Sequence, residues 1–297
     1  VLYLASGADK DGNVQSAFLH VIEKRLSYQN PDLQEQLVFD DEAVWHEVCR
    51  KSIFWHTSTK LQFDEDAYVD ASWAAESIEV AREVRQLAKI DPTLQLQFDN
   101  DVAKANVSDA PSPEMRVLDL ASGIGGNMVY FAMESDLVVG VELSADRVAI
   151  SNNNISEYGL NNAIVVQDDI FNFIEQFADK PAEKAAELGI GRYFQTSTMF
   201  DCVHISPPWG GKCYAGSCNG SVYTLQRNFD IKRAMASMAK IGNIVSVYLP
   251  RSQSVRELVT LASIGNFPLI VISAYHVPTK VRCIHAHFVR RVECFSY

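Results

Sequence analysis

The sequence has few cysteines, no long apolar run and no excess of basic residues. Its six cysteines are scattered over 297 residues, which fits a reducing compartment better than a disulfide framework. Cys213 and Cys218 have no second pair nearby, so we expect no zinc site there. No apolar run has the length of a membrane span, so we expect no membrane partner.

Basic residues are outnumbered, with 26 Lys and Arg against 37 Asp and Glu, which disfavours a surface that tracks a long nucleic acid. The charge is uneven along the chain. Residues 1–150 have a net charge of −14, whereas residues 151–297 have a net charge of +3. A locally basic pocket therefore fits the second half, and a small anionic ligand fits this chain better than a polynucleotide surface.

From residue 115 onward, apolar strands alternate with amphipathic helices, which predicts an α/β fold with a mostly parallel sheet. We expect seven strands, at 117–120, 138–141, 164–167, 200–205, 244–249, 269–274 and 281–289. We expect helices between them, at 126–134, 145–158, 170–178, 230–240 and 253–262. The last two strands have no helical pattern between them and predict a C-terminal antiparallel hairpin that turns at 277–280.

The N-terminal part predicts helices. Phe18, Leu19, Ile22 and Leu26 recur at helical spacing, so we expect a small helical appendage in residues 1–40. A second helix is expected from Asp41, and a third after Ser72, which is a good N-cap residue. The predicted organisation is a helical N-terminal region at 1–98, followed by an α/β domain at 115–297.

A strand, a glycine-rich turn and the start of a helix follow one another in residues 117–126. The turn lets the backbone approach a ligand, and the helix N-terminus offers N–H donors. Asp119 at the strand tip would repel a pyrophosphate but could pair with an ammonium group. Glu142 lies 23 residues further on, where a carboxylate accepts from ribose hydroxyls. With Asp168 and Asp169 available for an adenine amine, the pattern indicates S-adenosylmethionine.

The stretch Ser206-Pro207-Pro208-Trp209-Gly210-Gly211 follows the strand expected at 200–205. Prolines cannot continue a sheet ladder, and each holds the residue before it extended, which fixes the carbonyls of Ser206 and Pro207. Trp209 can stack on a planar ring, and the glycines let a flat ligand approach. This arrangement suits a planar group with an exocyclic amine. The alternative is a strand-terminating turn with a buried Trp.

Together these motifs resemble the trimethylguanosine synthase family, whose members methylate guanine N2 in the 7-methylguanosine caps of small nuclear and nucleolar RNAs. The resemblance covers about residues 41 to 291. It rests on the stretches 117–119, 123–127, 141–142, 151–154, 157–159, 168–169, 248–251 and 45–61, and most specifically on 206–211. The chain departs from the family at Ala121-Ser122, where an aromatic residue and a Cys are usual, in an insertion at 179–198 and in the loop 212–221.

The resemblance implies a Rossmann-like class I methyltransferase fold, with the methyltransferase domain at 115–297 and contributions to the substrate site from 1–98. It implies that Ser206, Pro207 and Trp209 hold and orient 7-methylguanine, and that Lys60 and Arg251 bind the cap phosphates. The expected contacts to S-adenosylmethionine come from Ser72, Asp119, Ala121, Gly123, Gly125, Asn127, Glu142, Asp168 and Asp169. The expected partner is 7-methylguanosine-capped RNA. The expected location is the nucleus, with the cytoplasm as a second, and the catalytic domain is expected to be monomeric.

Two other readings remain open from the sequence. One is a guanine-N2 or adenine-N6 methyltransferase that acts on another RNA, and the overall acidity counts against a large structured RNA. The other is a cap-binding module that has lost methyl transfer, against which Asp119, Glu142 and Asp169 count because a pure binder would not need them.

Overall fold

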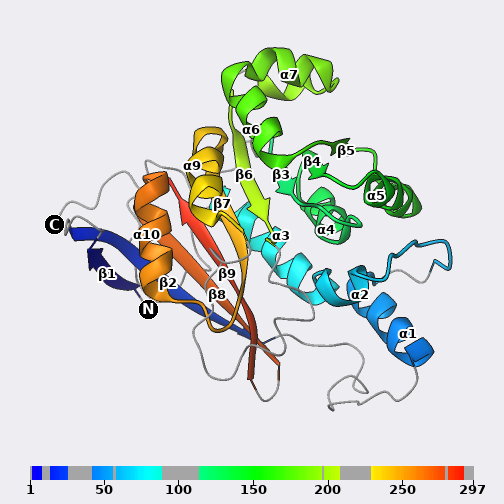
Figure 1. Cartoon of the computed structure of the whole chain (residues 1–297), viewed down its shortest axis with the longest axis horizontal. Helices are drawn as coiled ribbons and strands as arrows, with labels where there is room; N and C mark the ends of the chain where they lie inside the picture. Colours follow the sequence, from blue (N-terminus) through cyan, green and yellow to red (C-terminus); the bar gives the residue numbers. More distant parts are fainter. Residues whose placement is uncertain are drawn as a thin grey trace, which may run out of the picture.

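The strands of this computed structural model form a single nine-stranded sheet (Figure 1). The structure describes residues 2–8, 14–25, 42–55, 58–88, 114–195, 197–207, 229–277 and 280–290. The strand order is β1-β2-β8-β9-β7-β6-β3-β4-β5. The strands are β1 (Leu2–Ala8), β2 (Val14–Arg25), β3 (Arg116–Leu120), β4 (Leu137–Glu142), β5 (Ala163–Gln167), β6 (Phe200–Ile205), β7 (Gly242–Pro250), β8 (Leu269–Val277) and β9 (Lys280–Val289).

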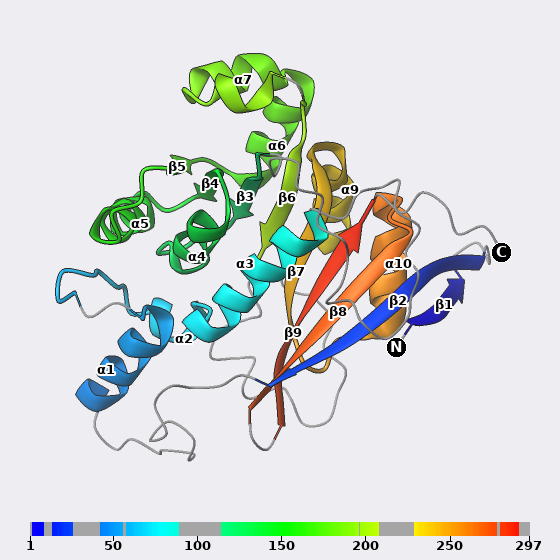
Figure 2. The ribbon, with the colours of Figure 1, turned by 180° about the vertical axis from the view of Figure 1, so that it is seen from behind.

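Helices cover both faces of the sheet (Figure 2). One face packs against α1 (Glu42–Ile53), α3 (Ala74–Ala88), α4 (Gly126–Glu134) and α5 (Ala145–Glu157), with the short α2 (Ala67–Asp70) beside them. The other face packs against α6 (Ile170–Asp179), α9 (Ile231–Ile241) and α10 (Val255–Gly265). Strands β3 and β4 are buried along their whole length, as expected for parallel strands covered on both sides.

The seven predicted strands are confirmed as β3 to β9. Strands β5, β4, β3, β6 and β7 pair in parallel, and β9 runs antiparallel to both β7 and β8. The predicted C-terminal hairpin is confirmed, because Val277 pairs with Lys280 across the turn. All five predicted helices between the strands are present, and the helices expected from Asp41 and after Ser72 are confirmed as α1 and α3.

The prediction of a helical appendage in residues 1–40 is wrong. Strands β1 and β2 form an antiparallel hairpin, and β2 adds to the sheet in parallel with β8, from Phe18 opposite Leu269 to Arg25 opposite His276. A short apolar run fits a period of two as well as a helical period, and tertiary pairing decides between them. Here β2 covers the backbone groups of β8 that an edge strand would leave unpaired.

The insertion at 179–198 adds α7 (Pro181–Glu187) and a 3₁₀ turn, η3 (Gly191–Phe194). Its side chains Ala185, Ile190 and Phe194 are buried in the same apolar cluster as α6. The insertion therefore extends the layer of helices that covers this face of the sheet. None of the helices in the described ranges is both long enough and apolar enough to span a membrane.

Candidate cofactor and substrate site

The turn after β3 is held in a conformation that leaves its backbone open to a ligand. Ala121, Gly123 and Gly125 all have left-handed backbone angles, with φ of 57°, 57° and 86°. A Cβ at Gly125 would lie 2.5 Å from the Oγ of Ser151, so a side chain there has no room. The turn therefore delivers the chain from the end of β3 to the start of α4 with few side chains in the way.

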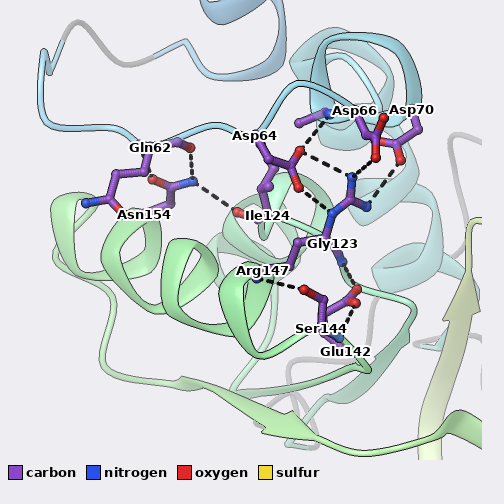
Figure 3. Close-up of polar contacts among 11 residues, drawn as sticks. Gln62, Asp64, Asp66, Asp70, Gly123, Ile124, Glu142, Ser144, Arg147 and Asn154 are labelled. Carbon is purple, nitrogen blue, oxygen red and sulfur yellow. Dashed lines mark hydrogen bonds and ion pairs between the residues drawn. The ribbon is translucent and has the colours of Figure 1, made fainter.

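Glu142 is the last residue of β4, and its carboxylate is fixed beside this turn (Figure 3). Its Oε2 accepts from the backbone N–H of Gly123 at 2.9 Å, and its Oε1 accepts from that of Ser144 at 2.9 Å. Each oxygen keeps a further lone pair for a ligand hydroxyl. The structure thus places Glu142 where the sequence predicts it, at the strand end next to the glycine turn.

Asp119 is buried in β3, and neither of its carboxylate oxygens has a hydrogen-bond partner among the described residues. Burial, together with the nearby Glu142, raises the pKa of the Asp119 carboxyl well above its usual range. A buried acid without partners is unfavourable, so a cationic ligand group would relieve it. The ammonium and hydroxyl groups of S-adenosylmethionine therefore fit the acids that this edge of the sheet presents.

Two more predicted acids follow β5. Asp169 caps α6, because its Oδ1 accepts from the N–H groups of Phe171 at 2.9 Å and Asn172 at 3.1 Å. Asp168 is less exposed than Asp169, and its Oδ1 accepts from the side-chain amide of Asn172 at 2.7 Å. The strand ends β3, β4 and β5 thus each carry an acid at the same edge of the sheet.

Ser72 lies close to the glycine turn, but it does not cap α3. Its buried Oγ has no partner among the described residues, and the N–H groups of Glu76 and Ser77 donate to the backbone carbonyl of Trp73 instead. The N-cap prediction is therefore wrong, since the helix starts one residue later than a Ser72 cap requires. The carbonyl of Ser72 lies 3.9 Å from the position of a Cβ at Gly126, which places Ser72 at the start of α4.

The side chain of Asn127 points into a polar layer between α3 and the sheet. Its amide lies 2.7 Å from the Oγ of Ser77 and 3.3 Å from the Nε2 of His204, whose Nδ1 lies 3.1 Å from the Oγ of Ser246. Burial, and secondarily His287, lowers the pKa of His204 to about 3, so the imidazole is neutral.

The same layer contains a buried glutamate that the sequence analysis missed. Glu83 of α3 binds Ser273 at 2.8 Å, Tyr275 at 2.9 Å and His287 at 3.1 Å. A signal was present, because His204 and His287 each lie between apolar residues near the end of a predicted strand. Assigning them a partner required knowing that α3 lies over β7 and β9.

A second group of contacts that the sequence analysis missed joins α5 to the segment 58–70. Arg147 binds Asp64 at 2.6 Å through its Nε and Asp70 at 3.2 Å through its Nη1 (Figure 3). Asn154 binds the backbone of Gln62. The stretch 151–154 contributes to the family resemblance, but the sequence alone does not show that it binds the segment 58–70.

On the substrate side, Ser206 and Pro207 directly follow β6, and Pro207 is buried. Lys60 and Arg251 are both exposed, and the Nη1 of Arg251 donates to the carbonyl of Val281 at 3.4 Å. Trp209, with Pro208, Gly210 and Gly211, lies outside the described residues. The structure therefore locates the end of β6, from which the stretch 206–211 begins. The position of Trp209 stays a prediction.

The order and direction of β3 to β9, with acids at the ends of β3, β4 and β5, define the fold as that of the class I methyltransferases. The chain shares this fold with the solved METTL16 MTase domain (TM-score 0.51, 13% identity, 96% of this chain and 86% of that chain). It also shares it with the human methyltransferase 10 domain containing protein (TM-score 0.51, 13% identity, 85% of this chain and 99% of that chain). At 13% identity, these two similarities show a shared fold and nothing about the reaction.

A family model for RNA cap guanine-N2 methyltransferases matches residues 114–290, and the chain belongs to this family. Trimethylguanosine synthase of Schizosaccharomyces pombe is 28% identical over 190 residues, which are 62% of this chain and 70% of that protein. The Saccharomyces cerevisiae protein of the same name is 28% identical over 146 residues, 48% of this chain and 41% of that protein. The second match thus spans less than half of its relative.

The family model and the relatives confirm the predicted class of enzyme, an S-adenosylmethionine-dependent methyltransferase that acts on guanine N2 of RNA caps. The family match confirms S-adenosylmethionine as the cofactor and an RNA cap as the substrate class. It favours guanine N2 over the adenine-N6 alternative.

Proposed function

We propose that this chain methylates the exocyclic N2 of 7-methylguanosine caps and so forms dimethyl- or trimethylguanosine. The observation that supports this most is the register of two neighbouring strands. Leu120 at the end of β3 lies opposite Ile205 at the end of β6. The glycine turn and Ser206-Pro207 therefore leave the sheet side by side, about 5 Å apart. A methyl donor on the first and an amine on the second would meet at this edge.

The cofactor supplies a methyl group on a cationic sulfur, and the protein has to hold and orient both partners. In the proposal, Glu142 accepts from the ribose hydroxyls and Asp119 pairs with the ammonium group. Ser72, Asn127 and the turn residues Ala121, Gly123 and Gly125 line the cofactor, with Asp168 and Asp169 at the adenine end. Asn127 would line the cofactor with its backbone and not with its side chain, because the side-chain amide already binds Ser77 and His204.

The guanine N2 lone pair is delocalised into the ring, so the amine is a poor nucleophile. Catalysis then comes mainly from orientation, with the Ser206 hydroxyl and the Pro207 carbonyl accepting from the amine and directing it at the methyl group. Both groups follow a buried strand, which is a rigid support. In the proposal, Trp209 stacks on the base and Lys60 and Arg251 bind the cap phosphates.

The proposed partner is the capped 5′ end of an RNA rather than its body. A net charge of −11 disfavours contacts with a long backbone, whereas a few cations suffice for cap phosphates. The proposed location is the nucleus, with the cytoplasm as a second, and the proposed catalytic unit is a monomer.

A mass-spectrometric methylation assay tests the proposal. The purified chain, S-adenosylmethionine and either 7-methyl-GDP or GDP are incubated, and the guanine products are resolved. We expect one or two added methyl groups on 7-methyl-GDP and little product from GDP. Asp119→Asn should abolish the product. Equal transfer to both nucleotides would contradict the requirement for a 7-methylated cap.

A further inference from the structure

Helix α5 presents a row of polar side chains to the segment 58–64, and contacts recur at every second residue of that segment. The Oγ of Ser58 donates to Glu157 at 2.7 Å, and the amide of Asn153 donates to the carbonyl of Lys60 at 2.9 Å. Asn154 binds Gln62, and Arg147 binds Asp64. The two pieces run in opposite directions, so the segment is attached to α5 from one end to the other.

Asn154 is the central contact of this row (Figure 3). Its side chain is fully buried, its Oδ1 accepts from the N–H of Gln62 at 2.8 Å, and its Nδ2 donates to the carbonyl of Gln62 at 3.0 Å. The second hydrogen of Nδ2 goes to the carbonyl of Ile124, also at 3.0 Å. These backbone partners fix the orientation of the amide, because no other assignment pairs donors with acceptors.

Ile124 lies in the glycine turn between Gly123 and Gly125, whereas Gln62 lies two residues after Lys60. Asn154 therefore joins the turn of the proposed cofactor site directly to the segment that carries Lys60. The amide of Asn153 donates to the carbonyl of Lys60 itself and, at 3.3 Å, to the Oδ1 of Asn154, and it makes no contact with the turn among the described residues. The backbone of Lys60 is thus held by α5, while its side chain stays exposed and free to reach an anion.

We propose that Asn153 and Asn154 are positioning residues that set Lys60 for the cap phosphates, and that Asn154 also fixes the cofactor turn. The inference rests on the proposed function, because it takes Lys60 as a phosphate contact. It assigns a purpose to two of the three consecutive asparagines of α5. An exposed lysine on a loosely held loop would lose conformational freedom when it binds a phosphate, and the contacts to α5 reduce that loss.

A double-mutant cycle tests the proposal. The quantity is the phosphate dependence, defined as KM for 7-methylguanosine divided by KM for 7-methyl-GDP. It is measured for wild type, Lys60→Ala, Asn153→Ala, Asn154→Ala and each Asn variant combined with Lys60→Ala. We expect Lys60→Ala to lower the phosphate dependence about 10-fold, and each Asn variant about 3- to 10-fold. In the Lys60→Ala background the Asn substitutions should lower it no further, because they act through Lys60.

The neighbouring Asn152 provides the control, since its side chain is exposed and makes no hydrogen bond among the described residues. Asn152→Ala should match wild type in every measurement. Affinity for S-adenosylhomocysteine separates the two positioning residues, since Asn154→Ala should weaken it several-fold and Asn153→Ala should leave it unchanged. If Asn154→Ala does not fold, the cycle of Asn153→Ala with Lys60→Ala still tests whether α5 positions Lys60.

Two outcomes would overturn the inference, and they can be told apart. If Lys60→Ala leaves the phosphate dependence unchanged, the phosphate role of Lys60 in the proposed function is wrong, and the inference fails with it. If Lys60→Ala lowers it but neither Asn variant does, or if the losses add in the double variants, Lys60 binds phosphate without positioning by α5.

Discussion

The amide of Asn127 lies 3.3 Å from the Nε2 of His204, and this contact links the start of α4 to the strand that leads into Ser206. His204 is fully buried and also contacts Ser246 on β7. Through these bonds the cofactor turn and the proposed amine-holding motif share one polar layer. Because the ring is neutral and buried, its protonation should weaken the whole arrangement.

The first prediction concerns the pH dependence of this layer. The pKa of His204 in the folded chain is about 3, below the ordinary value near 6.5, so its contribution to stability is complete above about pH 6.5 and decreases as the pH falls toward 3. Between pH 7 and pH 4, the free energy of unfolding should decrease by about 1–3 kcal/mol less in His204→Gln than in wild type. Denaturant unfolding at both pH values measures this. Parallel losses in the two proteins would show that His204 is not buried as a neutral ring.

The second prediction is that Asp119 lowers stability and supports binding. Its folded-state pKa is raised, so the acid lowers the free energy of unfolding increasingly as the pH rises above about 4. Without cofactor, Asp119→Asn should be more stable by about 1–3 kcal/mol at pH 7, with a smaller gain near pH 4. Its affinity for S-adenosylmethionine should fall at the same time. Calorimetry that finds a less stable variant, or unchanged affinity, would contradict this account.

The third prediction concerns Arg251, whose side chain is exposed after β7. Arg251→Ala should raise KM for 7-methyl-GTP far more than KM for 7-methylguanosine, because only the former offers phosphates. The wild-type preference for the nucleotide should also weaken with added salt. As a control, Arg192→Ala removes an exposed charge on the η3 turn. An equal rise in KM for both substrates would show that Arg251 supports the fold and does not bind the phosphates.

The fourth prediction concerns Trp209 as the residue that selects a 7-methylated base. Stacking on an aromatic ring contributes about 1–3 kcal/mol for any base, whereas a cation–π contribution of about 0.5–2 kcal/mol applies only to the cationic 7-methylguanine. Trp209→Phe should keep much of the rate and lose part of the preference, and Trp209→Ala should lose both. The measurement is kcat/KM on 7-methyl-GDP and GDP. A folded Trp209→Ala variant with the wild-type rate would refute the stacking role.

Local patterns in the sequence predict most of the sheet and the acids of the site. Asp119 is the next-to-last residue of an apolar strand and Glu142 is the last residue of another. Parallel strands bring their carboxyl ends to one edge, so pattern and topology suffice to group the two acids. They do not suffice for β2, because its apolar residues fit two periods and only the pairing of Phe18 with Leu269 selects the strand. Nor do they suffice for Asn154, since its partners Gln62 and Ile124 are distant in sequence and a buried amide has no local signature.

The pairing of β2 with β8 also has a consequence for biosynthesis. About 250 residues separate Phe18 from its partner Leu269, so the ribosome makes the N-terminal hairpin long before the strand it docks on. An isolated two-stranded hairpin is marginally stable in water. We expect β1 and β2 to join the sheet last, after β8 has left the exit tunnel, which makes this edge the slowest part of the chain to mature.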